Sequence, residues 1–307
     1  MIQYYKVTRE NMYNNFNAGG NMENIRHFYD NVLLPSPKHF IQILYDKKFP
    51  AYLHDHNYYE LVIVVQGKGQ HQVGNSTFPV TRGDVFVIPP MIVHSFFDTE
   101  NLEIINIILR TEFIKKEQDK SQNVPGYFAL MEIEPFIRQN YDKSIFLHLN
   151  SLQLAEVQKD IKFIEHYSQL SPTDNFELQY HTTWKIIYYL SFLLNEQLNK
   201  LTKNNAAKYE TKILDTLEYI HQNFSEKIPI EKLTERVSLS RSTFLRSFQS
   251  ICGCSPMQYL NQYRVKKAVE LLDSSAMSKT EIAHFCGFYD LSHMERCIKL
   301  CSSTAPK

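Results

Sequence analysis

Four side chains in the N-terminal half of the sequence have the chemistry to bind a metal ion or a polar ligand: His54, His56, Glu60 and His94. Positions 54, 56 and 60 share the parity of a β-strand, so these side chains are expected on one strand face, with His94 approaching from another strand. Imidazoles with one carboxylate suit Fe, Mn, Ni or Zn and leave coordination positions open for a further ligand. Without a metal, the same groups would line a polar pocket, with Tyr58 on the same face as Glu60.

Short β-strands are expected to position these side chains. Between residues 40 and 109, apolar runs rich in β-branched residues alternate with turns that contain glycine. The predicted strands are Glu60–Gln66, Gly69–Val73, Asp84–Ile88 and Ile104–Leu109. This pattern favours an antiparallel barrel or sandwich over an alternation of strands and helices.

The pattern changes to a helical period after residue 150. Leu154, Val157, Ile161 and Ile164 are spaced three, four and three residues apart, which places them on one stripe of a helix. A second helix is expected from about Phe176. The sequence leaves two roles for the stripe open, because it could cover the barrel or form a seam with a second copy of the chain.

The C-terminal part of the sequence predicts two pairs of short helices. In the first pair, a helix over residues 231–237 is followed by a turn and by a second helix that Ser240 caps. In the second pair, Ser278 and Glu281 form a capping box, and Gly287 marks the turn. Each pair has the layout of a helix-turn-helix unit.

A spacing of 50 residues relates the two units. It separates Arg246 from Arg296, Phe248 from Ile298, and Pro256 from Pro306. The side chains between residues 241 and 269 that are charged at pH 7 are all basic: Arg241, Arg246, Arg264, Lys266 and Lys267. Two such units on one connecting helix, with a local excess of positive charge, are expected to bind adjacent major-groove segments of DNA.

The motifs of this region also resemble a known family. They read Ser255-Pro256-x-x-Tyr259-Leu260-x-x-x-Arg264-x-x-x-Ala268-x-x-Leu271-Leu272, then Glu281-Ile282-Ala283 and Gly287-Phe288-x-Asp290-x-Ser292. In combination they are similar to the AraC/XylS family of bacterial transcription activators. The resemblance implies binding to promoter DNA, recruitment of RNA polymerase and control by an N-terminal ligand-sensing domain. Met294 and Ile298 depart from the family pattern, which usually has aromatic residues there, so weaker packing of the second unit is expected.

On the family pattern, the second helix of each unit enters the major groove. The resemblance implies DNA-reading positions at Arg241, Ser242, Leu245 and Arg246 in the first unit, and at Leu291, Ser292, His293 and Arg296 in the second. An arginine can bind guanine through two hydrogen bonds, whereas serine and histidine can make single ones. The alternative is that the arginines contact phosphate only.

The histidine motif has a counterpart among known proteins as well. His54-x-His56-x-x-x-Glu60, followed after six residues by Gly67, resembles the first cupin motif. Gly83, Pro89 and His94 resemble the second, although Met91 stands where that motif normally has Gly. Sensor barrels attached to DNA-binding domains resemble cupins and often bind an organic effector directly. A divalent metal held by His54, His56, Glu60 and His94 and a metal-free effector pocket, which would add Tyr58, therefore both stay open.

These observations predict an α+β multidomain protein. The expected parts are an N-terminal arm (1–39), a cupin-like effector-binding barrel (40–115), a helical dimerisation and linker segment (116–205), and a DNA-binding domain with two helix-turn-helix units (206–307). We expect a homodimeric transcriptional regulator, most simply an activator, that responds to a small-molecule effector. The alternative is a metal-dependent cupin oxygenase or isomerase, but an enzyme has no use for a duplicated helix-turn-helix.

The composition agrees with a folded protein. Apolar residues make up 43% of the chain, charged residues 21%, and the formal net charge is zero. The five cysteines are clustered and odd in number, which favours reduced thiols over a disulfide framework. The sequence has no signal-peptide pattern and no apolar run of the roughly 20 residues that a membrane span requires, so a cytoplasmic location without a membrane contact is expected.

Overall fold

The structure is a computed structural model that describes residues 25–34, 40–47, 52–74, 76–121, 123–141, 147–170, 175–202 and 208–303. These residues form two compact units, which divide between residues 200 and 201. Most of the predicted N-terminal arm lies outside the described residues, as do Pro306 and the end of the predicted linker segment, residues 203–205. Within the described ranges, no helix combines the length and the apolar character needed to cross a bilayer.

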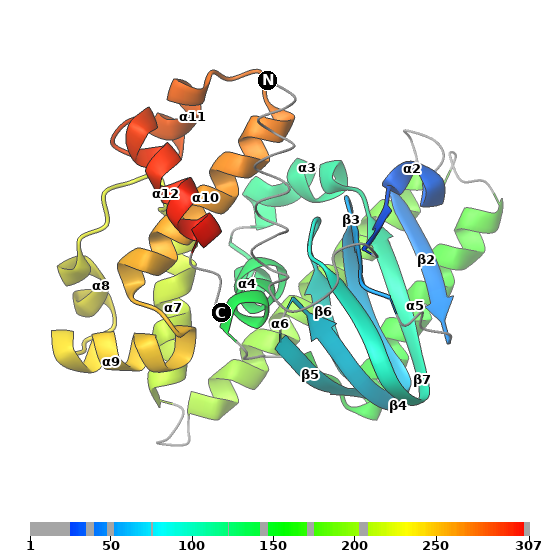
Figure 1. The fold of residues 1–307 in the computed structure, drawn as a ribbon. Helices are drawn as coiled ribbons and strands as arrows, with labels where there is room; N and C mark the ends of the chain where they lie inside the picture. Colours follow the sequence, from blue (N-terminus) through cyan, green and yellow to red (C-terminus); the bar gives the residue numbers. More distant parts are fainter. Residues whose placement is uncertain are drawn as a thin grey trace. The chain divides into compact units, whose positions relative to one another are not determined.

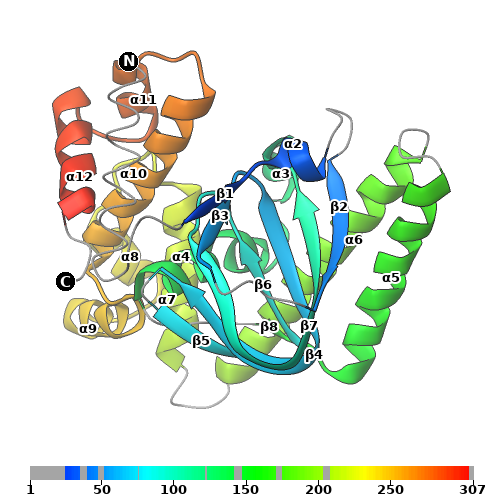
Figure 2. The same cartoon turned by 45° about the vertical axis from the view of Figure 1, so that its right-hand side comes forward.

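The first unit is built on a strongly curved sheet of eight strands, called the barrel below (Figures 1 and 2). The strands are β1 Arg26–Phe28, β2 Ile41–Asp46, β3 His54–His56, β4 Tyr59–Val73, β5 Ser76–Thr81, β6 Asp84–Ile88, β7 His94–Leu109 and β8 Leu147–His148. Their order is β1-β3-β7-β4-β6-β8, with β2 also paired to β7 and β5 to β4. The expected β-sheet domain is confirmed, and its sheet includes β1 and β8, which lie outside the predicted 40–115 segment.

The long antiparallel pair of β4 and β7 sets the direction of the side chains inside the barrel. Val62 of β4 and Phe96 of β7 belong to the buried apolar core, together with Phe86 of β6. Successive strand residues point to opposite faces, so Glu60, two residues before Val62, and His94, two residues before Phe96, also point inward. The strand parity thus places a carboxylate and an imidazole in the barrel interior.

The strand β4 is continuous where the sequence predicted two strands, Glu60–Gln66 and Gly69–Val73. Its register with β7 shifts between residues 64 and 70. Gly67 has a φ of 74°, and a Cβ atom there would lie 2.2 Å from the backbone oxygen of Asn101. The glycine that suggested a turn therefore marks a β-bulge, which bends the strand without ending it.

Helices complete the first unit. They are α2 Asp30–Leu33, α3 Thr111–Ser121, the π-helical η2 Ala129–Ile133, α4 Glu134–Tyr141, α5 Ser151–Leu170 and α6 Phe176–Thr202. The long helices α5 and α6 run antiparallel, as the ion pair between Lys185 and Asp160 (2.8 Å) and the hydrogen bond from Tyr189 to Glu156 (2.8 Å) require. The Tyr45 hydroxyl of β2 donates to Glu165 of α5 at 2.8 Å, which ties α5 to the barrel.

The predicted apolar stripe of α5 is covered within this unit. Leu154, Val157, Ile161 and Ile164 are at most 2% exposed. The structure buries all four side chains inside the unit, so they are not free to form a seam with a second chain. The stripe shows helical periodicity because one face of the helix is buried, and the partner is the chain itself.

The second unit consists of helices. They are α7 Lys208–Gln222, α8 Ile230–Arg236, α9 Arg241–Cys252, α10 Pro256–Ser274, α11 Lys279–Phe285 and α12 Leu291–Ser303. The predicted helix-turn-helix pairs are confirmed as α8–α9 and α11–α12, and α10 connects them (Figure 1). The predicted caps form, because the Ser240 hydroxyl accepts from the Thr243 amide and Ser278 and Glu281 make a reciprocal capping box.

Arg264 of α10 has a structural position, although the sequence placed it among the basic side chains expected to favour DNA binding. It is 7% exposed. Its Nε donates to the carbonyl of Phe224 and its Nη2 to the carbonyl of Glu226, both at 2.7 Å. The guanidinium satisfies two loop carbonyls and fixes the segment between α7 and α8 against α10.

Candidate functional site

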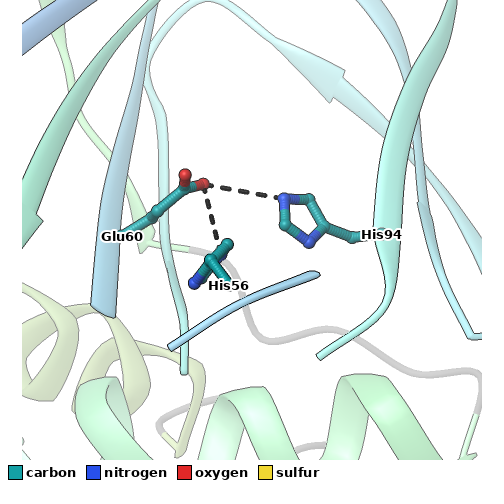
Figure 3. A group of neighbouring side chains, drawn as sticks. All are labelled: His56, Glu60 and His94. Carbon is teal, nitrogen blue, oxygen red and sulfur yellow. Dashed lines mark ion pairs between the residues drawn. The ribbon is translucent and has the colours of Figure 1, made fainter. Parts of the chain in front are cut away.

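Three of the four predicted metal-binding side chains meet inside the barrel. Figure 3 shows His56 from β3, Glu60 from β4 and His94 from β7 pointing toward one another. Glu60 Oε2 lies 3.7 Å from His56 Nε2 and 3.6 Å from His94 Nε2. The ligand atoms of the three residues lie within 4.8 Å of one another, and all three side chains are buried. The histidine and glutamate spacing therefore predicted a real cluster.

The chain reaches this arrangement differently from the expected single strand face. His54 and His56 belong to β3, and Glu60 belongs to β4 after a bend at residues 57 and 58. Met91 donates its amide to the His56 carbonyl at 2.7 Å and has a φ of 66°. This left-handed conformation explains why the cupin motif normally has glycine at this position. The loop before β7, which contains Met91, thus supports β3 through this hydrogen bond.

His54 and Tyr58 flank the cluster without joining it. The His54 ring lies 4.2 Å from the His94 ring, and their residues are paired across β3 and β7. The Tyr58 ring stacks on the His56 ring, with centroids 4.3 Å apart and planes 9° apart. The five residues predicted to bind an effector therefore surround one region of the barrel interior.

A second polar group, missed in the sequence, lies next to this cluster. His71 of β4 is fully buried and stacks on Phe86 (4.8 Å) and Phe96 (4.5 Å), with its ring edge-on to His94 (5.8 Å). Arg138 of α4 lies 3.3 Å from His71 Nδ1 through its Nη1 atom. His71 lies in the predicted strand Gly69–Val73, so its type and strand position were a usable signal. No local pattern pointed to Arg138.

Arg138 is itself held by an ion pair and a backbone contact. It is 1% exposed, and its Nε donates to Glu134 Oε1 at 3.0 Å. Its Nη2 donates to the carbonyl of Val87 in β6, and its guanidinium lies 4.8 Å from the centroid of the Phe86 ring. These contacts connect α4 to the side of the barrel that carries His71.

Burial controls the protonation of the cluster. Burial and then the neighbouring His94 lower the pKa of His54 to about 4. Burial also lowers the pKa of His56 to about 4, against the attraction of Glu60. Burial alone would raise the pKa of Glu60, but attraction to His56 and His94 outweighs it and lowers this pKa to about 2. At neutral pH, the cluster therefore combines a carboxylate with neutral imidazoles at positions 54 and 56.

The same burial acts on the flanking groups. It raises the pKa of the Tyr58 hydroxyl, and the charge on Glu60 adds to this shift. It lowers the pKa of His71 well below its ordinary value, and the adjacent Arg138 acts in the same direction. Both side chains are therefore neutral hydrogen-bonding groups at physiological pH.

In the second unit, the predicted DNA-reading positions differ in exposure. Arg241, Ser242, Arg246, Ser292 and Arg296 are exposed. The positions that are only partly exposed are Leu245, Leu291 and His293. Leu291 packs against the apolar core of the unit, so it differs from the freely exposed side chain that the family pattern implies. Arg241 forms an ion pair with Glu231 at 2.6 Å.

The departures from the family pattern keep the core of the second helix-turn-helix unit filled. Met294 is 1% exposed and lies in an apolar cluster with Ile282 and Phe288. Ile298 packs against the same cluster. Both residues contribute apolar side chains to the core, and their weaker packing than that of aromatic residues stays a prediction.

Comparisons with known proteins agree with both units. Residues 39–152 match the model described as an AraC-like ligand binding domain, and residues 233–307 match a helix-turn-helix domain. The chain is 28% identical over 242 residues to the HTH-type transcriptional activator RhaS of Salmonella paratyphi A, which covers 78% of this chain and 80% of that protein.

Two solved structures are also similar to parts of the chain. ToxT from Vibrio cholerae is 13% identical, with a TM-score of 0.35, over 87% of this chain and 95% of that one. The DNA-binding domain of AdpA, determined with a target DNA, is 31% identical, with a TM-score of 0.28, over 29% of this chain and 79% of that one. Given the two matched domains and the paired helix-turn-helix units, the chain belongs to the AraC family: it is a DNA-binding transcriptional regulator with an AraC-like ligand-binding domain, and not an enzyme.

Proposed function

We propose that this regulator activates transcription at promoters whose DNA it reads through α9 and α12, in response to a small-molecule effector bound in the barrel. The observation that carries the DNA-reading part is the equivalent placement of Arg246 and Arg296, 50 residues apart and exposed on the second helix of each unit. The direction of regulation is supported by the relatives, which are named activators.

Arg246 is the strongest candidate for reading a base. It is exposed on α9, whereas Arg241 at the start of the same helix is already engaged by Glu231. An arginine in the major groove can donate two hydrogen bonds to guanine, and Ser242 or Ser292 can add single contacts. His293 and Leu245, which are partly exposed, complete the proposed reading surface with Arg296 and Leu291.

The experiment is selection of bound sequences from a random duplex pool by the parent protein and by Arg246→Ala. We expect a loss of about 1–3 kcal/mol on the selected sequence and a relaxed preference at one base position. Arg82→Ala removes the same charge from an exposed site of the first unit and serves as the matched control. An unchanged base preference with uniformly weaker binding would assign Arg246 to phosphate contacts instead.

For the effector, we propose a site formed by His54, His56, Tyr58, Glu60 and His94. Their convergence in the barrel interior supports this assignment. The effector would act by a population shift, because a ligand changes a conformational equilibrium only through contacts that differ between the states. The double variant His56→Ala/Glu60→Ala should retain DNA binding and lose the response to effector. A response that survives would place the effector elsewhere.

We also propose that the regulator is a homodimer that contacts RNA polymerase. Exposed apolar side chains on α5 and α6 support the dimer, since Leu152 is 83% exposed and Phe192 is 50% exposed. Sedimentation of the full chain tests the dimer, and transcription in vitro with purified polymerase tests activation. A monomer at micromolar concentration, or binding without stimulated transcription, would contradict these parts of the proposal.

A further inference from the structure

The barrel cluster places two imidazole nitrogens and one carboxylate at one buried point. The backbone contacts of the two rings show which ring nitrogen carries a proton. His56 Nδ1 lies 2.7 Å from the carbonyl oxygen of Tyr58, and His94 Nδ1 lies 2.9 Å from that of Ile92. A carbonyl oxygen can only accept, so each Nδ1 is the donor and carries the proton. Each Nε2 is therefore the ring atom left to bind a further group.

Both Nε2 atoms face the Glu60 carboxylate (Figure 3). The two separations, 3.7 Å and 3.6 Å, are too long for hydrogen bonds. His56 Nε2 has no hydrogen-bond partner among the described residues, and its ring is fully enclosed. Glu60 is only 6% exposed. Burial of a carboxylate beside a ring nitrogen that has no hydrogen-bond partner costs free energy unless a further group binds both.

We propose that His56 Nε2, Glu60 and His94 Nε2 bind one divalent transition-metal ion, which forms part of the effector site proposed above. Two imidazoles with one carboxylate select a first-row metal such as Fe, Co, Ni or Zn over Mg or Ca, which prefer oxygen ligands. Two ligand atoms bound about 2.1 Å from one tetrahedral ion lie about 3.4 Å apart. The observed distances from Glu60 to the two nitrogens are close to this value.

The backbone contacts of the two rings also match a metal site. A metal-binding histidine commonly donates its second ring nitrogen to a carbonyl, which fixes the tautomer and the ring orientation. His56 and His94 both do so. His54 differs, because its Nδ1 lies 3.5 Å from the Tyr52 carbonyl and it is not grouped with the other three. The proposed set therefore has three protein ligands and leaves positions open for an oxygen-bearing effector or water.

The test measures metal binding on the full-length protein without an affinity tag. The apoprotein is titrated with Co²⁺, and the visible absorption of the bound ion is recorded. Metal content after dialysis against Zn²⁺ is measured by mass spectrometry. We expect one ion per chain in the parent protein and an affinity lower by at least about tenfold in Glu60→Gln and in His94→Gln, since even changes beyond the direct ligands have effects of this size.

The matched control is His181→Gln. His181 and Glu177 form a surface pair on α6, with Nε2 and Oε2 3.4 Å apart, and this pair has the same residue types in solvent. The His181→Gln variant should still bind one ion per chain. Circular dichroism verifies the fold of each variant, and the two variants lie on different strands, so a folding failure in one leaves the other to decide. Absence of stoichiometric metal in the parent, or loss of the ion in His181→Gln alone, would overturn the proposal.

The outcome is separable from that of the proposed function. Metal binding is measured without DNA, and sequence selection is performed with apoprotein and with metal-loaded protein. A metal-free barrel in a protein that selects a DNA sequence overturns the metal site only. A bound ion in a protein without sequence preference overturns the DNA-reading proposal and supports the metal site.

Discussion

Replacement of Arg138 by methionine is expected to destabilise the first unit by about 3–5 kcal/mol. Methionine keeps much of the aliphatic volume but has no donor. The guanidinium is 1% exposed and is paired with Glu134, which is 2% exposed. Removal of one partner of a buried ion pair leaves the other charge in a medium of low dielectric constant, and this accounts for most of the cost.

In Arg138→Met, two further acceptors lose their contact with the guanidinium. The Val87 carbonyl and His71 Nδ1 both face Arg138. A buried acceptor without a donor costs about 1–3 kcal/mol, although relaxation and water entry reduce the sum. Because a domain of this size has a total stability of about 5–15 kcal/mol, the variant should remain folded but be close to its limit.

Urea denaturation followed by tryptophan fluorescence measures this effect. The chain has one tryptophan, Trp184, which is buried in the first unit and stacks on Phe113 at 5.1 Å. Its emission therefore reports this unit alone. The double variant Arg138→Met/Glu134→Leu should recover most of the loss, since an apolar pair can replace a buried ion pair. A single-variant cost below about 1 kcal/mol, or a double variant as unstable as the single one, would refute the reasoning.

Three other predictions concern strain, burial and ionisation. Gly287→Ala should destabilise the second unit by about 1–3 kcal/mol in calorimetry, because its Cβ would lie 2.6 Å from the Ser225 carbonyl oxygen. The control is Ser238→Gly at the equivalent turn, which should change the stability by under about 1 kcal/mol. Equal effects of the two variants would contradict this prediction. Ile161→Glu should lower the urea midpoint reported by tryptophan rather than dissociate a dimer, because residue 161 is buried within the chain; an unchanged midpoint would exclude this. Burial and then Glu270 raise the pKa of Cys286 from 9.0 to about 11, so its contribution to stability is present below pH 9 and is lost as the pH rises to about 11. Between pH 8 and 10.5, the melting temperature should therefore fall less in Cys286→Ala than in the parent protein. An equal fall in both proteins would count against this prediction.

The sequence predicted the barrel cluster because residue type and spacing were both informative. His54, His56 and Glu60 share one strand parity and precede an apolar run, so His56 and Glu60 stood out. The position of His94 followed from the second motif. Arg138 was not predictable, because its contacts are with Val87 and His71, which lie 51 and 67 residues away in the chain. Local periodicity contains no information about such pairings.

Periodicity also identified buried faces without identifying what covers them. The stripe of Leu154 and Ile161 predicted one buried side of α5, and the structure confirms that burial. Whether the cover is the same chain or a second one depends on tertiary contacts such as that between Tyr45 and Glu165. In the same way, Gly67 indicated a change of direction in the chain, but a bulge and a turn both favour glycine with a positive φ.

The two helix-turn-helix units show that conformation is repeated more strictly than residue spacing. Ser238 and Gly287 both have positive φ, 50° and 77°, and both donate their amide to the carbonyl three residues earlier. These turn positions are 49 residues apart, whereas the N-caps Ser240 and Asp290 are 50 apart. Tyr289 is thus an additional residue in the second turn, and it is 85% exposed. The units share a fold but present different surfaces at the start of their second helices, so their contributions to DNA binding should be measured separately.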